Sequence, residues 1–232
     1  MLHTWLLDSD NIRMTGYFLQ LSSYFSAWFY MYQNLETLQW YNRAICNVPQ
    51  EKKIELKTRV IGSVHAIILA LFSCGYLSNM LSFETWALCL PISGAYGLFD
   101  LTIVTLNYKI FKKGYFAICC HHFILIFGPL TTTLLFSRLI SQAYLFEVTV
   151  PVLDLSWYMY QANMKNSLFF KINSCFAILL FLFFRVLNST YLTYSVLGIN
   201  NTLCIISTCF WSLNMFWFQK LVNVFWKSIK QE

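Results

Sequence analysis

Residues 86–108 read WALCLPISGAYGLFDLTIVTLNY and contain a single charged side chain, Asp100. A helix needs about 20 mostly apolar residues to cross the hydrocarbon core of a bilayer, and this run is long enough. Further runs of the same character cover residues 13–33, 60–80, 115–136, 143–161, 169–189 and 201–222. The sequence therefore predicts an all-α integral membrane protein with about seven transmembrane helices.

The composition agrees with a membrane protein and excludes several other classes. Of the 232 residues, 58% are hydrophobic and 11% charged, whereas a soluble domain has about 25% charged residues. The net charge of +6 does not indicate nucleic-acid binding, because the basic residues lie between apolar runs instead of forming one face. The eight cysteines form no C-x-x-C pair, so we expect no zinc framework, no redox motif and no cofactor.

The basic residues also predict an orientation in the membrane, because cytosolic loops carry an excess of Lys and Arg. Alternate connections hold Arg43, Lys52, Lys53, Lys57 and Arg59, then Lys109, Lys112 and Lys113, then Lys165 and Lys171, and finally Lys220, Lys227 and Lys230. The opposite connections hold only Arg13 and Arg138. The C-terminus is therefore expected in the cytosol, and the sequon at Asn200 on the lumenal side.

Several ionisable residues lie inside the apolar runs, where each costs about 2.5–3.5 kcal/mol on insertion scales. With a rise of about 1.5 Å per residue, members of four predicted helices fall at nearly one depth in the cytosolic half: His65, Asp100, His121 and Asp154. Glu147 and Arg185 fall in the lumenal half, where we expect them to form an ion pair. The shared depth indicates a polar site, although buried polar side chains also serve simply to hold helices together.

The adjacent His121 and His122 lie about 100° apart around a helix. One of them is therefore expected to face the site and the other to brace a neighbouring helix. With four histidines in the chain, metal binding is a weak alternative. A transporter or channel is another, since intramembrane charges also mark ion paths.

The order of these motifs resembles the TLC-domain family, which includes translocation-associated membrane proteins, ceramide synthases and small TLC-domain-containing proteins. The similar elements are Arg59 followed by His65, Tyr96 followed by Asp100, the doublet His121-His122, the acidic proline-containing segment 147–157, and Arg185. The resemblance covers about residues 55–222 and is nearest to the small members. It implies an N-terminal helix and loop over residues 1–54, a six-helix TLC bundle over 55–222, and a cytosolic tail over 223–232.

The family resemblance implies a protein of lipid homeostasis in the endoplasmic reticulum. Such a protein would bind or handle a membrane lipid in an intramembrane cavity, and the residues expected to line the cavity are His65, Tyr96, Glu147, Asp154 and Arg185.

The alternative is an N-acyltransferase of the ceramide-synthase type that uses acyl-CoA. In it, His121 or His122 would act as a base or acyl acceptor, oriented by Asp100 or Asp154. Two departures from the family pattern bear on this choice. The His-Asp element of ceramide synthases, with a second Asp three residues later, does not occur here, which favours lipid binding. Asp154 and Ser156 stand where small members commonly have Asn and Arg, which alters the charge of that helix.

Overall fold

The computed structural model describes residues 2–112, 114–127, 137–199 and 201–230, and within these ranges the chain is helical with no β-strand. The α-helices are α1 (Leu2–Asn34), α2 (Gln39–Ile45), α3 (Lys53–Leu77), α4 (Phe83–Ala87), α5 (Cys89–Leu106), α6 (Tyr108–Phe111), α7 (Tyr115–Phe127), α8 (Ser137–Tyr144), α9 (Val150–Gln161), α10 (Leu168–Leu180), α11 (Asn188–Val196) and α12 (Asn201–Lys230). Shorter turns of other helix types are η1 (Leu35–Thr37), η2 (Gln50–Lys52), η4 (Leu145–Thr149) and η5 (Phe181–Leu187). The all-α prediction is confirmed over these residues.

Three helical runs of the described chain are long and apolar enough to cross a membrane, judged by length and composition. They are Gln50–Leu77, Phe83–Leu106 and Leu168–Val196. These runs contain most of the predicted spans 60–80, 86–108 and 169–189. Helices also occupy much of the other four predicted runs, but their passage through a membrane stays a prediction. Part of the run 115–136, and the sequon residue Asn200, lie outside the described residues.

The fifth predicted run, residues 143–161, is not one continuous α-helix. It consists of the end of α8, the 3₁₀ segment η4 and the helix α9. Pro151 lies at the start of α9, where its lack of an N–H costs nothing, whereas in a helix interior its ring would clash with the carbonyl of Glu147. The proline therefore fits the start of α9. Residues 137–161 are helical without a gap, and their passage through a membrane as one span stays a prediction.

The helix ends follow local backbone chemistry. Ser82 and Ser167 precede α4 and α10, and their hydroxyls accept hydrogen bonds from the backbone N–H of Thr85 and Phe170, which stabilises a helix start. Asn163, with φ of 58°, follows α9 in the left-handed conformation. The N–H of the next residue, Met164, bonds back to Met159, which is the arrangement that closes many helix C-termini.

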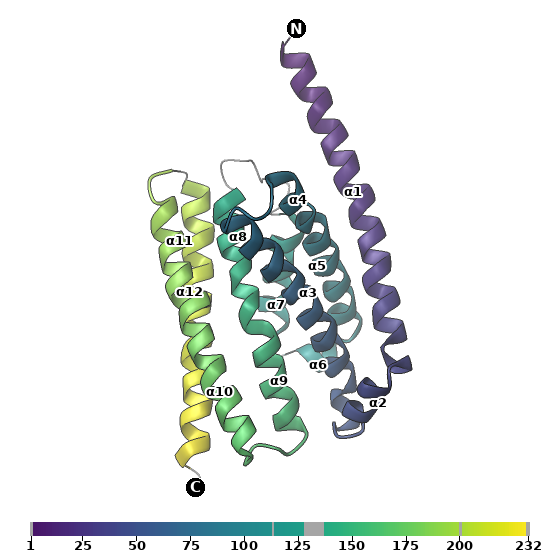
Figure 1. Cartoon of the computed structure of the whole chain (residues 1–232), viewed down its shortest axis with the longest axis vertical. Helices are drawn as coiled ribbons and strands as arrows, with labels where there is room; N and C mark the ends of the chain where they lie inside the picture. Colours follow the sequence, from purple (N-terminus) through teal and green to yellow (C-terminus); the bar gives the residue numbers. More distant parts are fainter. Residues whose placement is uncertain (1, 113, 128–136, 200, 231–232) are drawn as a thin grey trace. The chain divides into compact units, whose positions relative to one another are not determined.

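The helices form two compact units, one of residues 1–65 and 81–135 and the other of residues 66–80 and 136–232. In the first unit α1 packs along α5, and α5 packs against α7 (Figure 1). The phenol of Tyr17 in α1 donates to the carbonyl of Ile126 in α7 at 3.0 Å. The indole of Trp28 in α1 donates to the carbonyl of Ile92 in α5 at 3.3 Å. The helix α5 is therefore the central element of this unit.

Small residues let the neighbours of α5 approach it closely. A Cβ added to Gly97 would lie 3.1 Å from Cβ of Leu125 and 3.3 Å from the backbone oxygen of His122, both in α7. A Cβ added to Gly94 would collide with the phenol of Tyr17. Close backbone approach at small residues is a common feature of helix packing in membranes, and here it brings α7 close enough for its side chains to reach those of α5.

In the second unit α9 packs against α10, and α11 packs against α12 (Figure 1). The amide of Asn173 in α10 donates to the carbonyl of Val152 and to the hydroxyl of Ser156, both in α9. Two stacked aromatic pairs, Phe146 with Phe210 and Phe181 with Phe218, join η4 and η5 to α12. This unit is therefore held by interhelical hydrogen bonds together with aromatic packing.

The close approach at Gly97 generates a test of the α5–α7 packing. We expect Gly97→Val to lower the melting temperature of the purified protein in detergent, because overpacking costs about 1–3 kcal/mol. The matched control is Gly16→Val, since a Cβ at Gly16 meets nothing within 4 Å. Equal melting temperatures for the two variants would show that α7 does not approach α5 as described.

Candidate functional site

A short, buried polar contact inside the first unit joins α5 to α7. The Nε2 atom of His122 lies 2.7 Å from Oδ2 of Asp100, and both residues are buried. With Asp100 ionised, Nε2–H donates to the carboxylate, and Nδ1 is left as the nitrogen with a free lone pair. This Nδ1 is buried and has no hydrogen-bond partner among the described residues.

Tyr96 of α5 contacts both His122 and His65 of α3, and so connects His65 with this pair. The rings of His65 and Tyr96 stack with centroids 3.9 Å apart and an interplanar angle of 14°. The ring of Tyr96 also meets that of His122 edge-on at 6.0 Å. His65 is 1% exposed, and neither of its ring nitrogens has a partner within the described part of the chain. We call His65, Tyr96, Asp100 and His122 the histidine cluster.

The histidine cluster holds three buried imidazole nitrogens without a partner among the described residues. Leaving a buried donor or acceptor unsatisfied costs about 1–3 kcal/mol, so such groups are concentrated where a ligand or ordered water completes them. The aromatic surroundings, which include the edge of Trp28 against both His65 and Tyr96, are apolar. The arrangement is therefore suited to a polar group attached to an apolar body.

The two histidines of the doublet have different surroundings. His122 is 4% exposed and faces Asp100, whereas His121 is only partly buried, with its ring centroid 5.2 Å from that of His122. Asp100 is therefore placed to orient His122. Of the two candidates in the doublet, His122 is the one built into the histidine cluster.

The second unit contains the other predicted site residues, Glu147, Asp154 and Arg185. Arg185 is buried, and its Nε donates to the carbonyl of Phe146 at 3.2 Å and to the hydroxyl of Thr149 at 2.7 Å. Glu147 and Asp154 both act on its charge electrostatically. We call Glu147, Thr149, Asp154 and Arg185 the arginine cluster. The ion pair of Glu147 with Arg185, and a common depth of Asp154 with the histidines, stay predictions.

The sequence interpretation did not single out Trp28, Gly62 or Thr149. Gly62 matters because a Cβ at this position would lie 2.8 Å from the phenol oxygen of Tyr96. Its spacing of three residues before His65 is a signal that places both on one face of a helix. Trp28 lies in the predicted N-terminal segment 1–54, and nothing in its sequence context connects it with α5.

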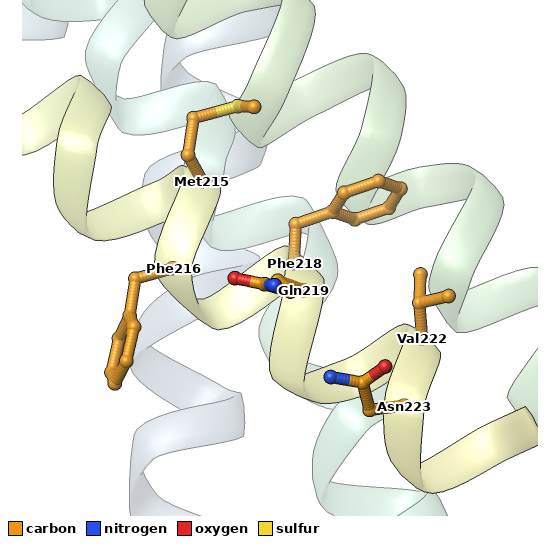
Figure 2. A pocket seen from close by; sticks show the side chains of 6 residues that line it. All are labelled: Met215, Phe216, Phe218, Gln219, Val222 and Asn223. Atoms are coloured by element: carbon orange, nitrogen blue, oxygen red, sulfur yellow. The ribbon is translucent and has the colours of Figure 1, made fainter.

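The described residues form no cluster of metal-ligating side chains, and a hollow along α12 is lined by that helix alone. No three His, Cys, Asp or Glu side chains come together as a metal ion would need, within residues 2–112, 114–127, 137–199 and 201–230. Figure 2 shows a hollow whose lining residues all belong to α12: Met215, Phe216, Phe218, Gln219, Val222 and Asn223. Residues of one helix alone do not converge on a ligand from several sides, as a binding site requires.

Comparisons of this chain with protein-family models, with curated proteins and with solved structures find no match. The geometry of the two clusters is therefore the basis of any functional conclusion. The resemblance to the TLC-domain family stays an interpretation of the motifs.

A double-mutant cycle tests the contact between Asp100 and His122. Removing one partner leaves a buried polar group uncompensated, which costs about 3–5 kcal/mol for a charged pair. We expect Asp100→Ala and His122→Ala each to lower the free energy of unfolding, measured in detergent, and the double variant to lose clearly less than the sum. The control cycle combines Asp100→Ala with Asn223→Ala, which removes an exposed amide of α12, and is expected to be additive within about 0.5 kcal/mol, as sites without shared partners are. Additivity in both cycles would contradict the contact.

Proposed function

We propose that this chain is a multi-pass membrane protein of lipid homeostasis that binds a membrane lipid at the histidine cluster. The observation that carries the proposal is the set of three buried imidazole nitrogens, two of His65 and one of His122, without partners among the described residues. A lipid headgroup with a hydroxyl, amide or phosphate group satisfies such nitrogens. The aromatic rings of Trp28 and Tyr96 provide apolar contacts for the adjoining part of its chains.

The membrane arrangement is part of this proposal. About seven helices cross the bilayer, with the N-terminus outside or in a lumen and the C-terminus in the cytosol. The distribution of Lys and Arg between alternate connections supports this orientation. The motif order supports membership of the TLC-domain family and, with it, a location in the endoplasmic reticulum.

A second candidate function is N-acyl transfer from acyl-CoA, which the 2.7 Å contact of His122 with Asp100 favours. A carboxylate on one ring nitrogen fixes the tautomer and the orientation of the imidazole. His122 Nδ1 would then take the proton from an attacking amine as its nitrogen bonds to the acyl carbon, while Asp100 stabilises the imidazolium. The C–S bond to CoA would break, and the imidazolium would return the proton to the leaving thiolate. Lipid binding is the better supported function, because the unpartnered nitrogens of His65 have no role in this transfer.

Exchange of the doublet histidines separates a functional from a structural role. We expect His122→Gln and His122→Ala to lose co-purified lipid and to change cellular lipid composition, because neither retains an imidazole paired with Asp100. His121→Gln is the matched control. It is expected to keep the co-purified lipid and the normal cellular lipid composition, since its amide keeps a donor and an acceptor. The measurement is mass spectrometry of lipids extracted from the purified protein and from cells.

Expression level and detergent melting serve as the folding check for each variant. If His121→Ala and His122→Ala both fold normally and leave bound and cellular lipid unchanged, the doublet only holds helices together and the proposed function is wrong. Acylation of an amine by the purified protein with acyl-CoA, lost in His122→Gln, would instead establish the acyltransferase.

A further inference from the structure

The arginine cluster lies within the second unit. Arg185 belongs to η5, a π-helical segment inside the membrane-length run Leu168–Val196. Its guanidinium lies 5.4 Å from the ring of Phe181 and 6.0 Å from that of Trp217 in α12. Segments of π-helix often occur at functional sites, and this one points a charge toward α12.

The residue of α12 that faces this region is Asn214. It lies four residues after Phe210, which stacks on Phe146, and four before Phe218, which stacks on Phe181. Residues at this spacing share one helix face, so Asn214 lies on the face of α12 that packs against η4 and η5. It comes three residues before Trp217, whose ring lies 6.0 Å from the Arg185 guanidinium. Asn214 is 0% exposed, and neither its amide nitrogen nor its amide oxygen has a hydrogen-bond partner among the described residues.

The charges around Asn214 indicate what kind of group it binds. Arg185 already interacts with the two acidic side chains Glu147 and Asp154, so an anion would meet carboxylates and a cation would meet the guanidinium. The amide of Asn214 is neutral and offers two donors and one acceptor oxygen. Its complement is a neutral group that donates and accepts at once, which a hydroxyl or a carboxamide does.

The walls around Asn214 indicate what that group is attached to. The same face of α12 makes aromatic contacts with η4 and η5, and the rings involved are Phe146, Phe181, Phe210, Trp217 and Phe218. These rings favour an apolar chain next to the polar group, since burying apolar surface is favourable. A free, fully polar solute would leave this surface without a matching partner.

We propose that Asn214 binds the hydroxyl- or amide-bearing headgroup of a neutral lipid, in a site formed by η4, η5 and α12. This site is formed by other residues than those of the histidine cluster and does not depend on the function proposed there. Asn214 makes both hydrogen bonds to the headgroup, and Arg185 is held in place by Phe146, Thr149 and the acidic side chains. The aromatic rings contact the first part of the lipid chains.

Photolabelling of the full chain in lipid nanodiscs tests this site. The probes are a diacylglycerol with a diazirine in one acyl chain and a phosphatidic acid with the same chains, which replaces the hydroxyl by a charged phosphate. We expect the diacylglycerol to label peptides of η4, η5 and α12, excess unlabelled diacylglycerol to compete, and phosphatidic acid to label them at least about tenfold less. Equal labelling by both probes, or no labelling of these peptides, would overturn the proposal.

The variant Asn214→Leu preserves the approximate side-chain volume and removes the amide. Because two hydrogen bonds are lost, we expect labelling to fall about tenfold or more. The melting temperature of the delipidated variant is expected to equal or exceed that of the wild type, since an unsatisfied buried amide has been removed. A marked loss of stability, or failure to fold, would show that the protein itself satisfies Asn214, which also contradicts the proposal.

Two controls separate this site from other effects. Asn223→Leu removes an exposed amide from the same helix and is expected to change neither labelling nor melting. His122→Gln, which alters the histidine cluster, is expected to leave labelling of η4, η5 and α12 unchanged. Loss of labelling in either control would mean that the probe does not report on Asn214.

Discussion

The hydrogen bond between His122 and Asp100 is the interaction on which the first unit depends most. A carboxylate inside an apolar helix is costly unless a partner compensates it, and the 2.7 Å contact with His122 provides that compensation. The contact needs α5 and α7 to lie close together, and Gly97 permits this approach. The close packing of α5 with α7 and the polar site thus both follow from the need to compensate the buried carboxylate of Asp100.

The second unit also contains a buried charge, and other groups compensate it. Arg185 is compensated by a backbone carbonyl, a threonine hydroxyl and the field of two carboxyl groups. In both units this leaves neutral buried groups without partners in the described chain, the imidazole of His65 in one and the amide of Asn214 in the other. Groups of this kind can form hydrogen bonds with the polar headgroup of a lipid, which is the role proposed for each of them.

Much of the fold could be predicted from the sequence, because apolar runs of helical length leave few alternatives. The change of helix type before Pro151 was not predicted, because the run 143–161 was expected to be one helix. The candidate site could be predicted only in part. Asp100 and the histidine doublet could be recognised as ionisable residues in apolar surroundings. The choice of His122 over His121 depends on the rotation of α7 against α5, which the sequence does not show. Trp28 and Asn214 are ordinary residues of apolar helices, and only packing shows their positions.

The most direct test of the account is a structure of the full chain in lipid nanodiscs, determined by electron cryomicroscopy with a bound antibody fragment to aid alignment. We predict Nε2 of His122 on Asp100. We also predict non-protein density within hydrogen-bond distance of Nδ1 of His122 or a ring nitrogen of His65, continuing into an acyl chain. Protein side chains or water alone on these nitrogens, with no lipid beside them, would contradict the central claim.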